Sequence, residues 1–244
     1  FDDVDFLEEP AAAAMGHHAG SRNAEDIVVV DVGGGTTDIA HATVGGDGAP
    51  RVHRAWGIPL GGTDIDLALS LAAYMPLLGR GESRVPAHHY VEAAMVQDTT
   101  RQRDFLRHDY RDVPSPWGER LQALQDTGNT ARLYRRVEDC KIALSSTPLH
   151  HSVLDFIEPG LERTVPVGVL SDAAHRYLDQ LDTLLLQVRA EIGRDPATLF
   201  MTGGMSRAGY IRDAATRVFP AARLVAGDPS FGVVQGLALA AAAR

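Results

Sequence analysis

The sequence predicts an α/β protein in which a mixed sheet is flanked by helices and carries an inserted α+β subdomain. The first observation behind this is the β-branched run 27–30, which ends at Asp31 and leads through three glycines into residues of alternating polarity. The second is the order of short apolar runs and amphipathic segments after residue 170. The third is the stretch 79–118, which is rich in arginine and proline and has no clean periodicity.

Composition excludes several classes of protein. The chain has 244 residues, of which 45% are apolar and 23% are charged, so it can bury a core. A net charge of -9 argues against nucleic acid as a partner. The acidic start of the chain and the lack of a long apolar run argue against a signal peptide and a membrane span. The single cysteine, Cys140, excludes an internal disulfide, so we expect a cytoplasmic protein.

The first 60 residues predict an antiparallel meander. Its strands are expected at 27–31, 37–44 and 51–57, with glycine turns at 33–35 and 45–48. A helix should follow Gly61-Gly62, with Thr63 as its cap and Asp66 three residues further on.

The middle of the chain predicts the inserted subdomain. Leucine spacing indicates helical structure up to Ser145, with an interruption at 127–129. Residues 153–157 and 163–167 are expected to pair as strands around Pro159-Gly160.

The last third predicts alternating helices and strands. Ser171 should cap a long helix that Gly193 ends. The remaining expected elements are a strand at 198–202, a turn at Gly203-Gly204, a helix at 206–219, a strand around Leu224 and a helix at 230–243.

The segment from Asp31 to Asp38 is the strongest chemical signal. Three glycines let the backbone approach a phosphate and tolerate the positive φ of an anion-binding nest, while Thr36 and the two carboxylates supply polar contacts and can hold hydrated Mg²⁺. It is neither a Walker loop nor a dinucleotide fingerprint, because no Gly-Lys-Ser/Thr follows and a strand comes next. The alternative is a plain glycine-rich hairpin turn.

Three further elements could contact a nucleotide. Gly61-Gly62 and Gly203-Gly204 are turns where the backbone could approach an anion. Glu138, Lys141 and Ser145 share a helix face, and Lys141 is the only lysine among 23 basic residues, which suggests a site that requires a compact ammonium. Taken alone, each glycine pair would be an ordinary connection between elements, and the helix face would be solvent-exposed. Their joint occurrence favours a nucleotide-binding site.

These segments resemble a known family. Residues 31–38, 61–66, 138–146 and 202–207 match, in order, the second lobe of the nucleotide-binding domain of DnaK-type heat-shock chaperones, and Glu9-Pro10 matches the end of the first lobe. The sequence is most similar to the YegD-like branch. The resemblance implies the ribonuclease H-like fold of the actin-like ATPases. It also implies three parts, which are residues 1–20 as the end of lobe I and a crossover, 21–62 with 171–244 as the core of lobe II, and 63–170 as its inserted subdomain.

The resemblance also implies roles for single residues. Asp31 would order water around Mg²⁺, with Glu9 near the metal, and Thr36 and Asp38 would position the attacking water. The implied nucleotide contacts are Gly34, Gly35 and Thr36 at the phosphates, with Gly61 and Gly62 nearby, Glu138, Lys141 and Ser145 at the ribose and adenine, and Gly203, Gly204 and Arg207 at the turn that closes the purine site.

Some positions depart from the family. Ile142 replaces an arginine that stacks on adenine, Met205 replaces a serine, and Ser230 replaces an aspartate near the base. The first lobe, with its phosphate loop and lysine, would precede residue 1, so we expect these 244 residues alone to be inactive.

The predicted function is the ATP-binding half of a DnaK-like chaperone ATPase of the stress response, using ATP or ADP with Mg²⁺. Its partners would be unfolded client proteins and a nucleotide-exchange factor on the inserted subdomain. The alternatives are another actin-like ATPase or kinase, or a nucleotide sensor without turnover. The histidine pairs 17–18, 88–89 and 150–151 are expected to be exposed rather than metal ligands, because neighbouring residues of a strand point to opposite faces.

Overall fold

The computed structural model describes residue 12, residues 23–45 and residues 51–226. The chain divides into two compact units, one formed by residues up to Thr63 and from Tyr177 onward, the other by Asp64–Arg176. Glu9, Pro10, His17-His18, most of the turn expected at 45–48, Ser230 and the helix expected at 230–243 lie outside the described residues.

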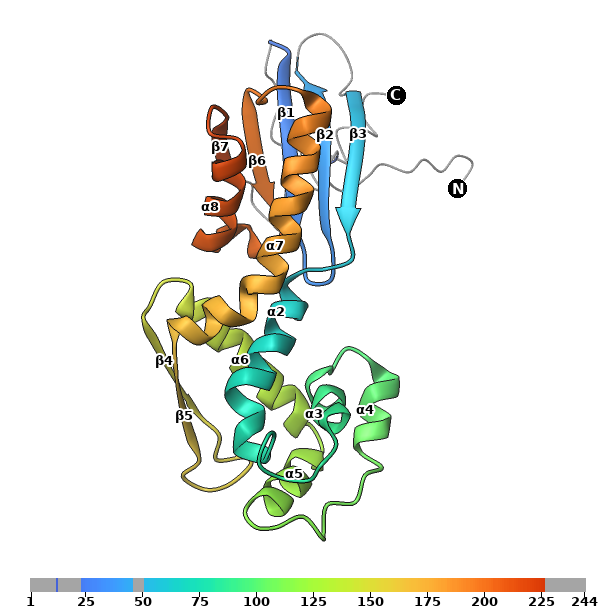
Figure 1. The fold of residues 1–244 in the computed structure, drawn as a ribbon, viewed down its shortest axis with the longest axis vertical. Helices are drawn as coiled ribbons and strands as arrows, with labels where there is room; N and C mark the ends of the chain where they lie inside the picture. Colours follow the sequence, from blue (N-terminus) through green and yellow to red (C-terminus); the bar gives the residue numbers. More distant parts are fainter. Residues whose placement is uncertain (1–11, 13–22, 46–50, 227–244) are drawn as a thin grey trace. The chain divides into compact units, whose positions relative to one another are not determined.

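The first unit contains a five-stranded mixed sheet in the order β3-β2-β1-β6-β7 (Figure 1). The strands are β1 (Glu25–Val32), β2 (Thr37–Val44), β3 (Arg51–Ile58), β6 (Thr198–Thr202) and β7 (Arg223–Ala226). The first three are antiparallel neighbours, whereas β6 runs parallel to β1 and β7 parallel to β6. The expected meander and the mixed sheet are both confirmed.

The middle of this sheet is buried because its strands are apolar on both faces. The last six residues of β1 and all five of β6 are buried, as expected for strands covered on both sides. Ile27, Val29, Ala42 and Phe200 are members of one apolar cluster. The edge strand β3 is largely exposed.

Helix α7 (Val167–Ile192) is tied to the sheet by hydrogen bonds from its half that belongs to the first unit. The Tyr177 hydroxyl lies 2.7 Å from the Thr37 hydroxyl of β2, and Trp56 of β3 donates to Glu191 at 2.9 Å. Gly193 ends the helix with φ +75°, as predicted. The start at Ser171 was wrong, because the helix begins at Val167 and the Ser171 hydroxyl donates to the Val167 carbonyl inside it.

The helix expected at 206–219 is two elements. A 3₁₀ turn, η3 (Gly204–Arg207), is followed by extended Ala208 and then by α8 (Gly209–Val218). The prediction of one continuous helix was therefore wrong, because its first turn is the separate 3₁₀ turn. Arg217 of α8 pairs with Asp182 of α7 at 2.9 Å, which connects the two helices.

The second unit is mainly helical. Its elements are the rest of α2 (Gly62–Leu69), a π-turn η1 (Ser70–Tyr74), a 3₁₀ turn η2 (Met75–Leu78), α3 (Ala87–Ala94), α4 (Thr99–Phe105), α5 (Trp117–Gln125), α6 (Asn129–Leu144), the hairpin strands β4 (Leu149–Val153) and β5 (Glu162–Pro166), and the start of α7. Gly128, with φ +84°, separates α5 from α6 where an interruption was predicted.

The first strand of the hairpin lies earlier than expected. β4 ends at Val153, and residues 154–157 form the turn that the prediction assigned to a strand. Pairing with β5 sets this register, since Leu149 lies opposite Pro166 and Val153 opposite Glu162. Among the described residues, no helix is long and apolar enough to cross a membrane.

Candidate functional site

Three neighbouring strands of the first unit place a row of polar residues across the sheet. Asp31 of β1 lies directly opposite Asp38 of β2 and beside Thr202 of β6, and Asp38 lies opposite Gly57 of β3. Residues paired in this way project from the same face. The two predicted catalytic carboxylates are therefore neighbours, and Asp31 is nearly buried.

Each of these carboxylates packs against a glycine. A Cβ at Gly203 would overlap Asp31 Oδ1 and the Val32 carbonyl oxygen, and a Cβ at Gly57 would lie 2.7 Å from Asp38 Oδ1. Gly203 also has φ +83°, which disfavours any other residue. The two glycines thus provide the space that the two carboxylates occupy.

The loop between β1 and β2 exposes its backbone. The Gly33 N–H donates to the Thr36 carbonyl at 2.9 Å and closes the hairpin, while Gly34, Gly35 and Thr36 are exposed. The amides of Gly34 and Gly35 donate no hydrogen bond within the described part of the chain.

The expected positive φ in this loop was wrong, because none of its three glycines has one. A Cβ at Gly34 would come no closer than 3.8 Å to another atom, and one at Gly35 would have nothing within 4 Å. Neither backbone conformation nor packing within the described chain therefore requires glycine at Gly34 or Gly35.

The Gly61-Gly62 segment holds this loop in place. The Gly62 N–H donates to the Gly33 carbonyl at 3.0 Å, and both the N–H and the hydroxyl of Thr63 donate to the Gly34 carbonyl at 2.8 Å. A Cβ at Gly61 would lie 2.6 Å from that carbonyl oxygen, so only glycine permits this backbone contact. The expected capping role of Thr63 was wrong, because Thr63 lies inside α2 and its hydroxyl serves the loop.

Thr37 anchors the other end of the loop. Its buried hydroxyl donates to the Leu60 carbonyl at 2.9 Å and is hydrogen-bonded to the Tyr177 hydroxyl. Sequence reasoning singled out neither Thr37 nor Gly57. The sequence did offer a signal for Gly57, because a glycine inside a strand often marks a close approach by another group. The role of Thr37, in contrast, depends on partners that are distant in the sequence.

The turn after β6 combines buried and exposed groups. Gly204 and Arg207 are exposed, whereas Met205 and Ser206 are buried. Gly203 packs on Asp31 and on the Val32 carbonyl. This turn therefore lies beside the row of polar residues and next to the loop 33–36 within the first unit.

The remaining predicted residues lie on α6 in the second unit. The Lys141 ammonium is buried and lies 2.8 Å from Asp66 Oδ2, and Asp66 is itself 2% exposed. Burial raises the pKa of Asp66, with Lys141 opposing this effect. Asp66 is thus the ion-pair partner of Lys141 within the second unit.

Glu138 and Ser145 flank this ion pair along α6. Both are half-buried, and the Ser145 hydroxyl donates to the Lys141 carbonyl at 3.0 Å. Ile142 is 62% exposed, while Cys140 is buried, as expected for a packed thiol. The structure thus groups the predicted residues into two sets, one in each unit, and Glu9 lies outside the described residues.

Comparison with known proteins finds distant relatives. The chain is 27% identical over 215 residues to the cell shape-determining protein MreB of Escherichia coli K12, and equally to those of Salmonella typhimurium and Shigella flexneri. The match covers 83% of this chain and 56% of each relative, so the chain spans about half the length of these proteins. No protein-family model matches the chain. The similarity and the mixed α/β fold indicate the actin-like ATPase superfamily.

Proposed function

We propose that this chain is the nucleotide-binding half of an actin-like ATPase, and that residues 33–36 receive the phosphate groups of ATP or ADP. The observation that supports this best is the pair Gly34 and Gly35. Both are exposed, both have unused amides, and nothing within the described chain requires glycine there. A ligand that approaches the backbone closely would explain why glycine occupies both positions.

The carboxylate row suits a magnesium ion that accompanies the phosphates. Mg²⁺ prefers oxygen ligands and keeps several waters, and Asp31 and Asp38 offer adjacent carboxylates in space left by two glycines. Asp31, with Glu9, would hold the ion through water, and the ion would neutralise charge on the phosphates. Asp38 and Thr36 would orient the attacking water.

The resemblance to the DnaK-type chaperones also assigns the nucleoside contacts. Glu138, Lys141 and Ser145 would contact the ribose and adenine, and Gly203, Gly204 and Arg207 would close the purine site. The Lys141 ammonium donates to the Asp66 carboxylate at 2.8 Å, which fixes its position on this helix face. Its burial in an ion pair also fits a position where arginine is too large.

Two biological roles are compatible with this site. Motifs 31–38, 61–66, 138–146 and 202–207 favour a DnaK-like chaperone ATPase that acts on unfolded proteins. The match to MreB over 83% of the chain favours a role in determining cell shape. Stimulation of ATP turnover by an unfolded polypeptide would support the chaperone. Altered cell shape on deletion, without such stimulation, would support the second role.

Nucleotide binding can be tested at Gly35 with a matched control. A Cβ at Gly35 or at Gly209 meets nothing within 4 Å, and both residues are exposed in the first unit. Gly35→Ala in the full-length protein should weaken Mg-ADP binding at least about tenfold by calorimetry, with an unchanged melting temperature. Gly209→Ala should bind like the wild type. Equal affinities of the two variants would contradict the proposal.

A further inference from the structure

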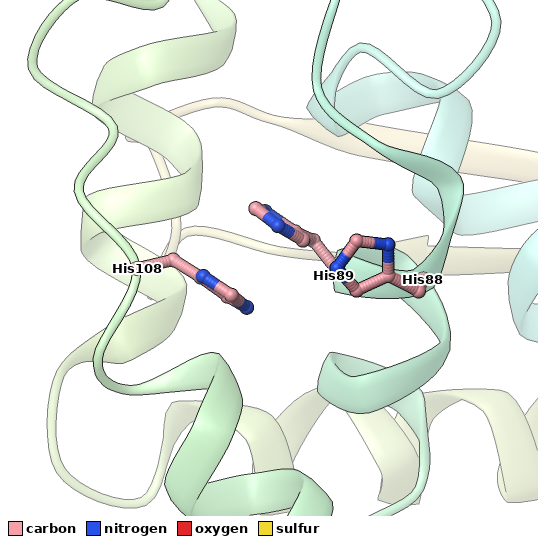
Figure 2. A group of neighbouring side chains, drawn as sticks. All are labelled: His88, His89 and His108. Carbon is pink, nitrogen blue, oxygen red and sulfur yellow. The ribbon is translucent and has the colours of Figure 1, made fainter.

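Three histidines of the second unit form a cluster apart from the proposed nucleotide site. His88 and His89 lie in the first turn of α3, and His108 lies three residues after α4 (Figure 2). One nitrogen from each ring can be chosen so that all three lie within 4.8 Å of one another. The expectation that neighbouring histidines point apart was wrong here, because His88 and His89 are in a helix rather than a strand.

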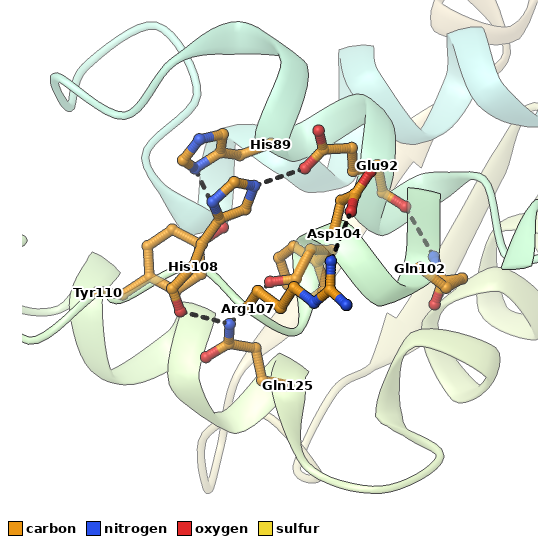
Figure 3. A network of polar contacts seen from close by, with 9 residues as sticks. His89, Glu92, Gln102, Asp104, Arg107, His108, Tyr110 and Gln125 are labelled. Atoms are coloured by element: carbon orange, nitrogen blue, oxygen red, sulfur yellow. Dashed lines mark hydrogen bonds and ion pairs between the residues drawn. The ribbon is translucent and has the colours of Figure 1, made fainter. Parts of the chain in front are cut away.

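Two of the three rings are held by hydrogen bonds that leave one nitrogen unused. His108 Nε2 lies 2.7 Å from a carboxylate oxygen of Glu92, and His89 Nδ1 lies 3.2 Å from the Tyr110 hydroxyl (Figure 3). A carboxylate bonded to the far nitrogen of a histidine is the usual outer support of a metal-binding imidazole. These hydrogen bonds leave the lone pairs of His108 Nδ1 and His89 Nε2 available to a metal ion.

His89 lies half-buried beside the other two rings. Partial burial, together with the neighbouring His108 and His88, lowers the pKa of His89 to about 4. His88 is exposed, so its ring can turn toward the other two.

We propose that His88, His89 and His108 bind one divalent transition-metal ion of the Zn²⁺ type. Imidazole nitrogens favour Zn²⁺, Ni²⁺ and Cu²⁺ over Mg²⁺ and Ca²⁺. Three histidines leave a fourth position for water. The rings of His89 and His108 are stacked, with centroids 3.4 Å apart and planes at 8°, so one ring tilts when both bind the same ion. The ion would link α3 to the segment after α4.

The site can be tested with Zn²⁺ alone on the untagged full-length protein. All variants carry His17→Ala and His18→Ala, so that this second histidine pair does not contribute. We expect one Zn²⁺ per chain by calorimetry at pH 7.5, with a dissociation constant in the micromolar range. Zn²⁺ should raise the melting temperature, and Co²⁺ should give the visible absorption of a four-coordinate site.

Variants separate this site from other histidines. His88→Ala and His108→Ala should each weaken Zn²⁺ binding at least about tenfold, and Glu92→Gln should weaken it by roughly tenfold through loss of the outer support. The control is His151→Ala, an exposed histidine of β4 in the same unit, which should change affinity less than twofold. His88 is exposed, so its replacement should leave the fold intact. Zn²⁺ binding that survives His88→Ala and His108→Ala, or no binding below about 100 μM, would overturn the proposal, whatever the nucleotide affinity.

Discussion

Lys141 and Asp66 form an ion pair inside the second unit, with the ammonium nitrogen 2.8 Å from one carboxylate oxygen. The other oxygen, Asp66 Oδ1, is buried and accepts no hydrogen bond from the described residues. The ionised form of Asp66 therefore depends on the positive charge of Lys141 for its stability inside the protein. Removing the lysine should leave a buried carboxylate without its counter-ion.

Lys141→Met should lower the free energy of unfolding by about 3–5 kcal/mol at pH 7, as for other broken buried ion pairs. The double variant Lys141→Met with Asp66→Asn should recover a large part of this loss. Urea denaturation of the single and double variants measures both effects. Equal stability of Lys141→Met and wild type would show that the pair contributes little.

The same variant should be sensitive to pH. Burial raises the pKa of Asp66, and loss of Lys141 raises it further. A folded state that binds the proton more tightly than the unfolded state gains stability as pH falls. The destabilisation of Lys141→Met should therefore shrink when the pH is lowered from 7 toward the raised pKa, and a loss that grows over this range would contradict the assignment.

Gly57→Ala should reduce turnover without unfolding the protein. The added Cβ would lie 2.7 Å from Asp38 Oδ1, and the end of that half-buried side chain can shift. Misplacing a catalytic group by about 1 Å can cost roughly a hundredfold in rate. ATP turnover of the full-length protein should fall at least tenfold, with Gly209→Ala as the control. Unchanged turnover would argue against a role for Asp38 in positioning water.

Gly203→Ala should destabilise the first unit more than Gly193→Ala does. Both glycines have positive φ, but only a Cβ at Gly203 would overlap other atoms, whereas one at Gly193 would meet nothing within 4 Å. Gly193→Ala should cost about 1 kcal/mol for its backbone conformation. Gly203→Ala should cost at least about 2 kcal/mol in chemical denaturation, and a smaller loss than at Gly193 would mean that Asp31 can move freely.

Ile142→Arg tests the predicted adenine contact. Ile142 is 62% exposed, so arginine can replace it without loss of packing. A guanidinium on an aromatic base contributes about 0.5–1 kcal/mol, which corresponds to ADP binding roughly two- to fivefold tighter. Leu186→Arg, at a similarly exposed position on α7, controls for the added charge. Equal effects of the two variants on ADP affinity would place the base elsewhere.

Local patterns were sufficient for most strands and for several helix ends. The run 27–30 and the glycines 128 and 193 are recognisable without distant partners, because periodicity and positive φ are properties of short segments. Ser171 misled because a serine that caps a helix and one that bonds to a carbonyl inside it look alike in the sequence. The start of β4 depends on β5, which periodicity alone does not include.

The candidate site likewise contains residues that local patterns predict and residues that only tertiary contacts bring together. Asp31, Asp38 and the glycines between them form a local motif, and the structure gives them adjacent places. The Lys141 pair joins residues 75 positions apart, and His108 meets His88 only through the packing of α3 and α4. Such contacts depend on tertiary structure, so residue spacing could not reveal them.

The loop 33–36 is held chiefly by main-chain atoms, because the Gly62 amide donates to the Gly33 carbonyl and the Thr63 amide donates to the Gly34 carbonyl. A frame of this kind keeps its shape when most surrounding side chains change, provided that Gly61 and Gly203 are retained. Changes of sequence can then alter the surface of the protein while the backbone of this loop keeps its shape. An identity of only 27% to the relatives is therefore compatible with a loop backbone that is unchanged beneath altered surface side chains.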